Sequence, residues 1–93
     1  MNDYPTDEQL EAIKNWKAND FTGLMEYIKP LWNYADVGYW EEKEKEYQIS
    51  TAGWSGNEDI IDAMQHNHIW WMMYWFQSQR GGHYIFRAHT NID

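Results

Sequence analysis

A run of large apolar side chains constrains the fold of this chain more than any other feature of the sequence. Residues 69–76 read IWWMMYWF, with no charged side chain among them. As a helix, the run would be apolar on every side and would need a larger protein or a membrane to cover it. We therefore predict a strand, in which odd-numbered and even-numbered side chains face opposite ways.

The residues after this run predict that the strand belongs to a hairpin. Gly81 and Gly82 in QRGG can adopt the positive φ values of a tight turn, and residues 83–89, HYIFRAH, read as the return strand. A strand that is apolar on both faces must be covered on both faces. Helices can cover one face, which leaves the other for a loop, a second copy, a ligand or another protein.

Aromatic residues supply the means to stabilise so short a chain. A chain of 93 residues buries a smaller fraction of its surface than a longer one. Its seven Trp, seven Tyr and three Phe can compensate, because each ring buries roughly 150–250 Å². We expect a single domain spanning residues 1–93. The chain has no cysteine, which excludes disulfides, thiolate zinc sites and cysteine nucleophiles.

The charge balance narrows the classes of partner. Fifteen acidic residues against seven basic ones give a formal charge of −8, which disfavours direct binding to nucleic acids or anionic membranes. A basic protein surface is the more natural partner, and the alternative is that the acidity only maintains solubility. The opening MNDYPTDEQL lacks the features of a signal peptide, and the aromatic run is too short to span a bilayer, so we expect a soluble cytoplasmic protein.

Two helices are predicted near the N-terminus. Thr6 and Gln9 form a capping-box pattern, and the helix that they begin should end near Asn19. A second amphipathic helix should follow, capped by Asn19 or Asp20. Because Pro30 lacks a backbone N–H, this helix should stop near Ile28 or kink there.

The middle of the chain predicts a hairpin and a third helix. Strands at about 37–42 and 46–52 would turn through EKEK, although a helix across residues 40–47 competes with this reading. A helix capped by Ser55 or Asn57 should then run to Asn67. The predicted class is therefore α+β, with two N-terminal helices and a small antiparallel sheet of two hairpins with one intervening helix.

Two short motifs carry a resemblance. GWSGNEDII and RGGHYIF, within residues 53–86, resemble a pattern found in small, mostly uncharacterised proteins encoded by bacteriophages and prophages. The resemblance brings no catalytic residues with it. It implies a phage context, in the cytoplasm of a bacterial host, where small acidic proteins often inhibit a host enzyme or a defence complex, anti-CRISPR proteins among them.

Neither catalysis nor metal binding is favoured by the side chains. Ser55 in GWSGN lacks the second glycine of a nucleophile elbow, so we expect no enzyme. His66, His68 and His89 could approach one another across a hairpin, but no carboxylate pattern completes a metal site. We therefore expect no metal and no cofactor.

Two sets of residues are candidates for binding. The first is an aromatic and acidic contact surface for a host or defence-complex protein, consisting of Tyr39, Trp40, Glu41, Glu42, Glu44 and Glu46. Mimicry of DNA by this segment is weakened by the interleaved Lys43 and Lys45. The second set would bind a nucleotide or another small ligand by stacking and phosphate pairing, and consists of Trp54, Trp71, Trp75, Arg80 and His83.

The sequence therefore predicts a non-enzymatic protein that binds and inhibits a host or defence-system protein. Two alternatives stay open. One is a protein that binds a nucleotide or another small ligand, and the other is a homodimeric structural module that uses a spare aromatic face of its sheet.

Overall fold

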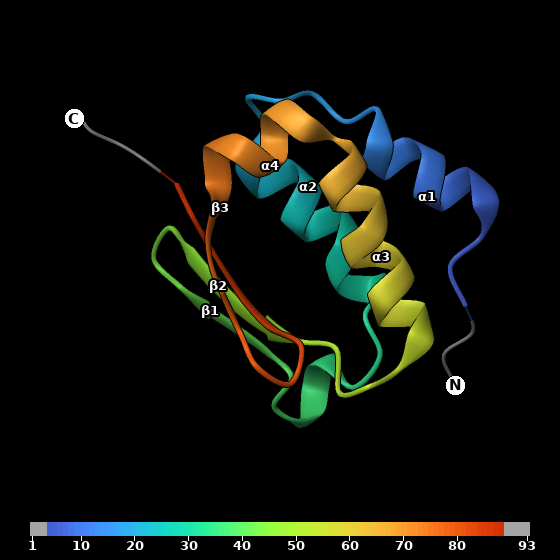
Figure 1. Ribbon diagram of the computed structural model, residues 1–93, viewed down its shortest axis with the longest axis vertical. Coiled ribbons are helices and arrows are strands. Elements are labelled where there is room, and N and C mark those ends of the chain that lie inside the picture. Colours follow the sequence, from blue (N-terminus) through green and yellow to red (C-terminus); the bar gives the residue numbers. More distant parts are fainter. Residues whose placement is uncertain (1–3, 89–93) are drawn as a thin grey trace.

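The structure is a computed structural model that describes residues 4–88. It has an α+β fold of two layers, in which α2, α3 and α4 lie over one face of a four-stranded antiparallel sheet and α1 packs outside α3 (Figure 1). The predicted fold class is thus confirmed. Among residues 4–88, no helix combines the length and apolarity needed to cross a membrane.

Helix α1 spans Asp7–Lys14 and begins with the predicted capping box. The Gln9 backbone N–H donates to Thr6 Oγ1 over 3.1 Å, and the Thr6 N–H donates to Gln9 Oε1 over 2.9 Å. The predicted end near Asn19 was wrong. The side chain of Asn67 donates to the carbonyls of Ile13 and Trp16, so a distant residue satisfies the carbonyls at the helix end.

Helix α2 spans Phe21–Ile28 and is capped by Asp20, whose Oδ1 accepts from the Gly23 N–H over 3.0 Å. It stops at the predicted residue. The chain continues as the 3₁₀ turn η1, Lys29–Leu31, which accommodates Pro30 near its start.

The predicted hairpin in the middle of the chain is present, and the competing helix is not. Strand β1 spans Trp40–Lys43 and β2 spans Glu46–Ser50, joined by a turn at which Lys45 has a φ of 63°. Strand β1 starts three residues later than predicted, because Ala35–Val37 form a second 3₁₀ turn, η2.

Helix α3 spans Ser55–His66, but neither predicted side chain caps it. Trp54 occupies the capping position, and the Ser55 hydroxyl hydrogen-bonds to the Tyr4 hydroxyl over 2.9 Å. Asn57 is fully buried and joins α3 to two distant loops instead. Its Oδ1 accepts from the Asn33 N–H over 2.8 Å, and its Nδ2 donates to the carbonyls of Asn33 and Thr51.

The largest departure from prediction concerns the aromatic run, which is not a strand over most of its length. Residues His68–Tyr74 form helix α4, and strand β3 begins only at Trp75 and ends at Gln79. The prediction assumed that every apolar side chain of the run is covered. In fact only Trp70 and Tyr74, four residues apart on one side of α4, are buried in the core.

The C-terminal hairpin closes the sheet. Strand β4 spans His83–Arg87, and the turn before it contains Gly81 and Gly82 with φ values of 85° and 79°, as predicted. The strand order is β1-β2-β4-β3, so β2 and β4 pair at the centre, with Tyr47 opposite Phe86. The core between the sheet and the helices includes Trp32, Trp70 and Phe86, each at most 1% exposed.

Candidate functional site

The largest group of exposed apolar side chains that are close in sequence lies on α4 and the start of β3. We call it the α4–β3 surface. Its members are exposed by between 39% and 77%, and they are Ile69, Met72, Met73, Trp75 and Phe76. Exposed apolar groups of this kind mark interaction sites more often than isolated exposed residues do.

Helical geometry explains why this surface exists. Three exposed residues of α4, Ile69, Met72 and Met73, are spaced by three and four, and they share one side of the helix. The opposite side carries Trp70, whose indole N–H donates to the Asp20 carbonyl over 3.2 Å, and Tyr74, which stacks on Phe21. Anchoring of the buried side therefore turns the other side to solvent.

Strand β3 extends the surface along an open edge of the sheet. It pairs only with β4, and all five of its side chains are exposed. None of these residues, WFQSQ, is charged. The other edge strand, β1, carries Glu41, Glu42 and Lys43, which discourage pairing with another strand. Strand β3 has no charged side chain, and only an irregularity in its pairing with β4 between Trp75 and Gln77 interrupts it, so its edge is the less protected of the two against contact with another chain.

Several contacts hold the exposed rings in place. Trp71 and Trp75 stack with ring centroids 6.0 Å apart, and the Trp75 indole donates to Ser78 Oγ over 2.8 Å. The Arg87 guanidinium lies 3.8 Å from the centre of the Phe76 ring while its Nε donates to Glu46 over 3.0 Å. Rings fixed in this way lose little conformational entropy on binding.

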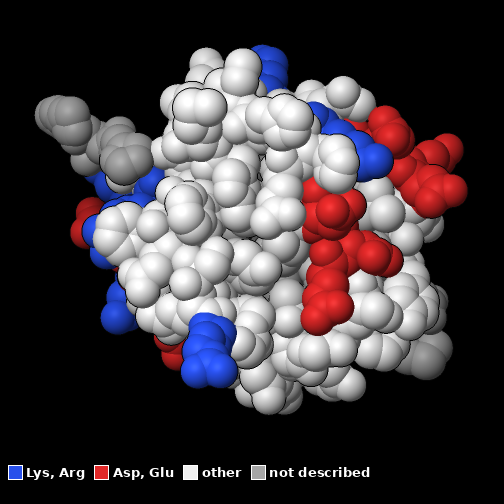
Figure 2. Space-filling view, viewed as in Figure 1, with Lys and Arg blue, Asp and Glu red and all other residues white. Residues whose placement is uncertain are grey.

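Charge is distributed unevenly around this surface. Residues 1–67 contain five lysines and fourteen acidic residues, a formal balance of −9, whereas residues 68–88 contain two arginines and no acidic residue. Figure 2 shows acidic side chains gathered over α1 and α3, while the part of this face over α4 and β3 is largely uncharged. The absence of acidic residues from residues 63–92 is a sequence signal that could have located this surface.

Only part of the predicted acidic contact surface is exposed and free of contacts within residues 4–88. Trp40 is only 7% exposed and belongs to the core. Its indole N–H donates to Glu42, which also forms an ion pair with Lys29 over 3.0 Å. The hydrogen bond from Lys29 is the main cause that lowers the pKa of Glu42, and the one from Trp40 adds to it.

Glu46 is also engaged within the molecule. Its carboxylate accepts from the Gln48 side chain over 2.6 Å and from Arg87 over 3.0 Å. The Gln48 hydrogen bond, followed by the contact with Arg87, lowers the pKa of Glu46. Tyr39, Glu41 and Glu44 remain exposed, and these two carboxylates form no ion pair with any residue among 4–88.

A groove lies beside this segment. It has a volume of about 490 Å³ and is lined by Lys29, Pro30, Ala35, Asp36 and Trp40. Tyr34 and Val37, which are 47% and 62% exposed, lie on the same stretch of chain. This second apolar region has fewer exposed apolar side chains than the α4–β3 surface, and Lys29 in its lining is ion-paired with Glu42.

The residues of the predicted ligand site are dispersed. Trp54 stacks on Tyr4 at the start of α3, with ring centroids 5.1 Å apart, whereas Trp71 and Trp75 stack on each other. Arg80 is exposed at the β3–β4 turn. His83 Nδ1 hydrogen-bonds to Ser50 Oγ over 2.7 Å. Within residues 4–88, Trp54 therefore stacks apart from the pair formed by Trp71 and Trp75.

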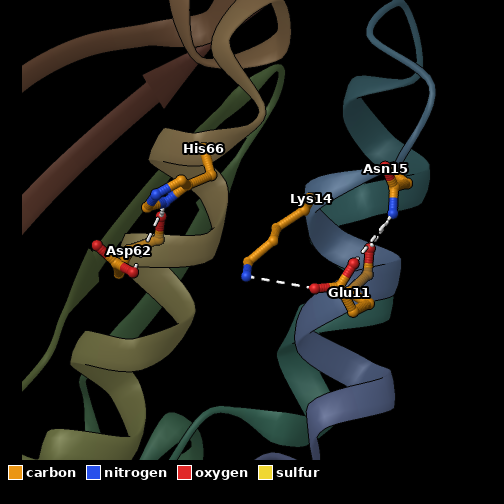
Figure 3. Close-up of polar contacts among 5 residues, drawn as sticks. All are labelled: Glu11, Lys14, Asn15, Asp62 and His66. Carbon is orange, nitrogen blue, oxygen red and sulfur yellow. Dashed lines mark hydrogen bonds and ion pairs between the residues drawn. The ribbon is translucent and has the colours of Figure 1, made fainter.

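The histidines predicted to approach one another are only partly described. His66 and His68 stack with ring centroids 6.4 Å apart, and His89 lies outside the described residues. His66 Nδ1 lies 2.8 Å from the Asp62 carbonyl oxygen, within α3. This part of α3 faces the Glu11–Lys14 ion pair of α1 (Figure 3). Within residues 4–88, no three histidine or carboxylate side chains lie close enough together to hold a metal ion.

Comparison of the chain with protein-family models, with curated proteins and with solved structures gave no match. The resemblance to phage-encoded proteins therefore stays a prediction, and the functional argument depends on the surface of the molecule.

Proposed function

We propose that this protein is a non-enzymatic binding protein that contacts a protein partner through the α4–β3 surface. The observation that carries the proposal is the exposure of five large apolar side chains within eight consecutive residues, 69–76, beside an uncharged sheet edge. Methionine and aromatic side chains are typical of protein contact surfaces, because they bury much area and adapt to the partner.

The charge pattern indicates the chemistry of the partner. Residues 68–88 have a formal balance of +2 within a chain of −8. A partner with an apolar patch bordered by acidic groups complements this surface. An acidic residue at the centre of the partner's patch would instead be buried among apolar side chains, with no cation to pair with it. This differs from the basic partner that the overall charge suggested, because the acidic residues lie on other elements.

The phage-like motifs supply the class of partner that we propose. In that context, the bound protein is a host enzyme or a component of a defence complex, and binding inhibits it. The proposal for this class rests on the resemblance of residues 53–86 alone, so it is tested separately from the contact surface.

The contact surface is tested by a pair of matched substitutions. Met72→Glu places a charge at the most exposed of the α4–β3 side chains, 77% exposed, and Val37→Glu places the same charge at a residue of η2 that is 62% exposed. Tagged wild-type and variant proteins are used to capture partners from bacterial lysate, and the affinity for each captured protein is then measured by calorimetry.

We expect a partner with an acidic surface that binds the wild type and the Val37→Glu variant alike and binds the Met72→Glu variant at least tenfold more weakly. Equal affinity of the wild type and both variants would show that the partner does not bind the α4–β3 surface. Loss of binding in the Val37→Glu variant alone would show that the partner binds at the groove beside η2 instead.

A second copy of the chain is the other occupant to consider, because β3 is an open and uncharged edge. Sedimentation equilibrium distinguishes this case. A mass near twice 11.3 kDa that returns to the monomer value in the Met72→Glu variant would indicate a homodimer instead of a complex with another protein.

A further inference from the structure

A hollow of about 380 Å³ opens between the start of α2 and the sheet. Residues from five parts of the chain meet there: the loop before α2, the first turn of α2, the β1–β2 hairpin, the end of α4 and the residue after β4. They are Asn19, Asp20, Phe21, Thr22, Lys45, Tyr47, Tyr74 and Ala88. The volume lies within the range of roughly 300–1,000 Å³ that is usual for small-molecule sites.

Two buried tyrosines line this hollow. Tyr47 is 7% exposed and Tyr74 is 8% exposed, and neither hydroxyl forms a hydrogen bond with any residue among 4–88. Phe21 fixes both rings, since it meets Tyr47 edge-on at 5.4 Å and stacks on Tyr74 at 4.7 Å. The two hydroxyl oxygens are not sealed from solvent, so water can satisfy them in the free protein and a ligand in the hollow can take the place of that water.

Both tyrosines are hydrogen-bond donors at neutral pH. Burial raises the pKa of Tyr47, and the charges of Glu42 and Glu26 raise it further. Burial also raises the pKa of Tyr74, with a contribution from Asp20. A protonated phenol can donate its hydrogen to an acceptor, so the two tyrosines that line the hollow can both act as donors.

Positive charge lies at the same place. The hollow borders the N-terminus of α2, an eight-residue helix whose dipole favours an anion. Lys45 is exposed at the rim and forms no ion pair with any residue among 4–88. The hydroxyl of Thr22, also exposed, adds a further donor at the first turn of α2.

Three carboxylates near the hollow oppose an anion. Glu26 and Glu42 act on Tyr47, and Glu42 is ion-paired with Lys29 over 3.0 Å. Asp20 is partly buried, but its two oxygens are already occupied, because Oδ1 accepts from the Gly23 N–H and Oδ2 from the Trp16 indole N–H, each over 3.0 Å. These hydrogen bonds stabilise its negative charge. The donors that line the hollow are the Lys45 ammonium group and the hydroxyls of Thr22, Tyr47 and Tyr74.

We propose that this hollow is a binding site for a small oxyanion, a phosphate or a carboxylate group, held by the hydroxyls of Tyr47 and Tyr74 and the ammonium group of Lys45. Phosphate and carboxylate share the acceptor oxygens that such donors recognise. The site shares no residue with the proposed protein-binding surface, and it would bind a small ligand at residues other than the ones that the sequence indicated.

The test is an NMR titration of the ¹⁵N-labelled full chain with inorganic phosphate and, separately, with acetate, at constant ionic strength. We expect saturable shifts in the backbone amides of Phe21, Thr22, Lys45 and Ala88 with at least one anion. Saturation by phosphate alone assigns a phosphate ligand, and saturation by acetate alone assigns a carboxylate.

Conservative variants establish whether the hydroxyls bind the anion. Each loss of one hydroxyl, in Tyr47→Phe or Tyr74→Phe, should weaken binding roughly fivefold, as expected for one hydrogen bond. Tyr27→Phe is the matched control, because Tyr27 is half-buried against Trp16 and does not line the hollow.

Three results would overturn the proposal. They are the absence of saturable shifts with both anions, equal shifts on addition of sodium chloride, and unchanged affinity in the Tyr47→Phe and Tyr74→Phe double variant. The Met72→Glu variant should bind the anion as the wild type does, so failure of the protein-binding proposal and failure of this one are distinguishable.

Discussion

Asn57 shows how one side chain can be decisive for a fold of this size. It is fully buried, and it uses both its carbonyl oxygen and its amide group to join α3 to the backbone of Asn33 and Thr51. Those two segments enter and leave the β1–β2 hairpin. Loss of the side chain leaves the Asn33 N–H and C=O without partners, whereas the Thr51 C=O keeps its hydrogen bond from the Trp54 N–H. A polar group that is buried without a partner costs more than its hydrogen bond contributes.

We expect Asn57→Ala to lower the free energy of unfolding by about 2–4 kcal/mol, because it leaves two backbone groups of the buried Asn33 without partners and removes the bond to Thr51 as well. Urea denaturation followed by tryptophan fluorescence measures the change. Asn15→Ala removes the same side chain from an exposed position, where Nδ2 donates to the Glu11 carbonyl, and should change stability by less than about 1 kcal/mol. Similar losses in both variants would contradict this account.

Helix α4 divides the functions of the aromatic run between its two sides. Trp70 is 0% exposed and contacts Phe21, Tyr74 and Phe86, whereas Met72 is 77% exposed. The buried side fixes α4 on the sheet, and the exposed side remains available to a partner. An element of only seven residues therefore carries both a stabilising role and the proposed contact.

This division predicts opposite outcomes within one helix. Trp70→Ala should lower the free energy of unfolding by about 3–5 kcal/mol, as a large cavity in a core does. Met72→Ala should change stability by less than about 0.5 kcal/mol and should weaken the captured complex. Thermal unfolding by circular dichroism separates the two variants, and substantial destabilisation by Met72→Ala would show that this side of α4 is packed.

At the scale of the whole molecule, stability should depend on pH at both extremes. The pKa values of Glu42 and Glu46 are lowered in the fold, by hydrogen bonds from Lys29 and Gln48 respectively. Groups with a lowered pKa stabilise the fold above their unfolded pKa and lose this contribution as the pH falls through the folded pKa. The pKa values of Tyr47 and Tyr74 are raised, mainly by burial, so stability should fall as the pH rises above 10.0.

Urea denaturation between pH 2 and pH 11 should give a plateau at neutral pH, with a decline below the unfolded glutamate value of 4.5 and another above 10.0. Glu42→Gln should make the acid decline shallower, since the lowered pKa disappears with the carboxylate. The effect is small because this ion pair is partly exposed. An unchanged acid limb in the variant would assign the decline to other groups.

The sequence determined the features that arise within a few residues. The capping box at Thr6, the stop of α2 before Pro30, the β1–β2 hairpin and the glycine turn at Gly81 depend on local geometry, and all were predicted. The α+β class followed from these elements. Local hydrogen bonds and allowed φ values act whatever the rest of the chain does, which is why they can be read without the fold.

Only the tertiary structure decided which side chains are buried, and with them the candidate sites. Apolar side chains in residues 68–74 permit either a strand or a helix, and helix α4 followed from the packing of Trp70 and Tyr74 against Phe21, nearly fifty residues earlier in the chain. The same packing exposed Met72 and placed Tyr47 and Tyr74 in the lining of one hollow. Burial is a property of surfaces brought together over long chain separations, so no local pattern can determine it.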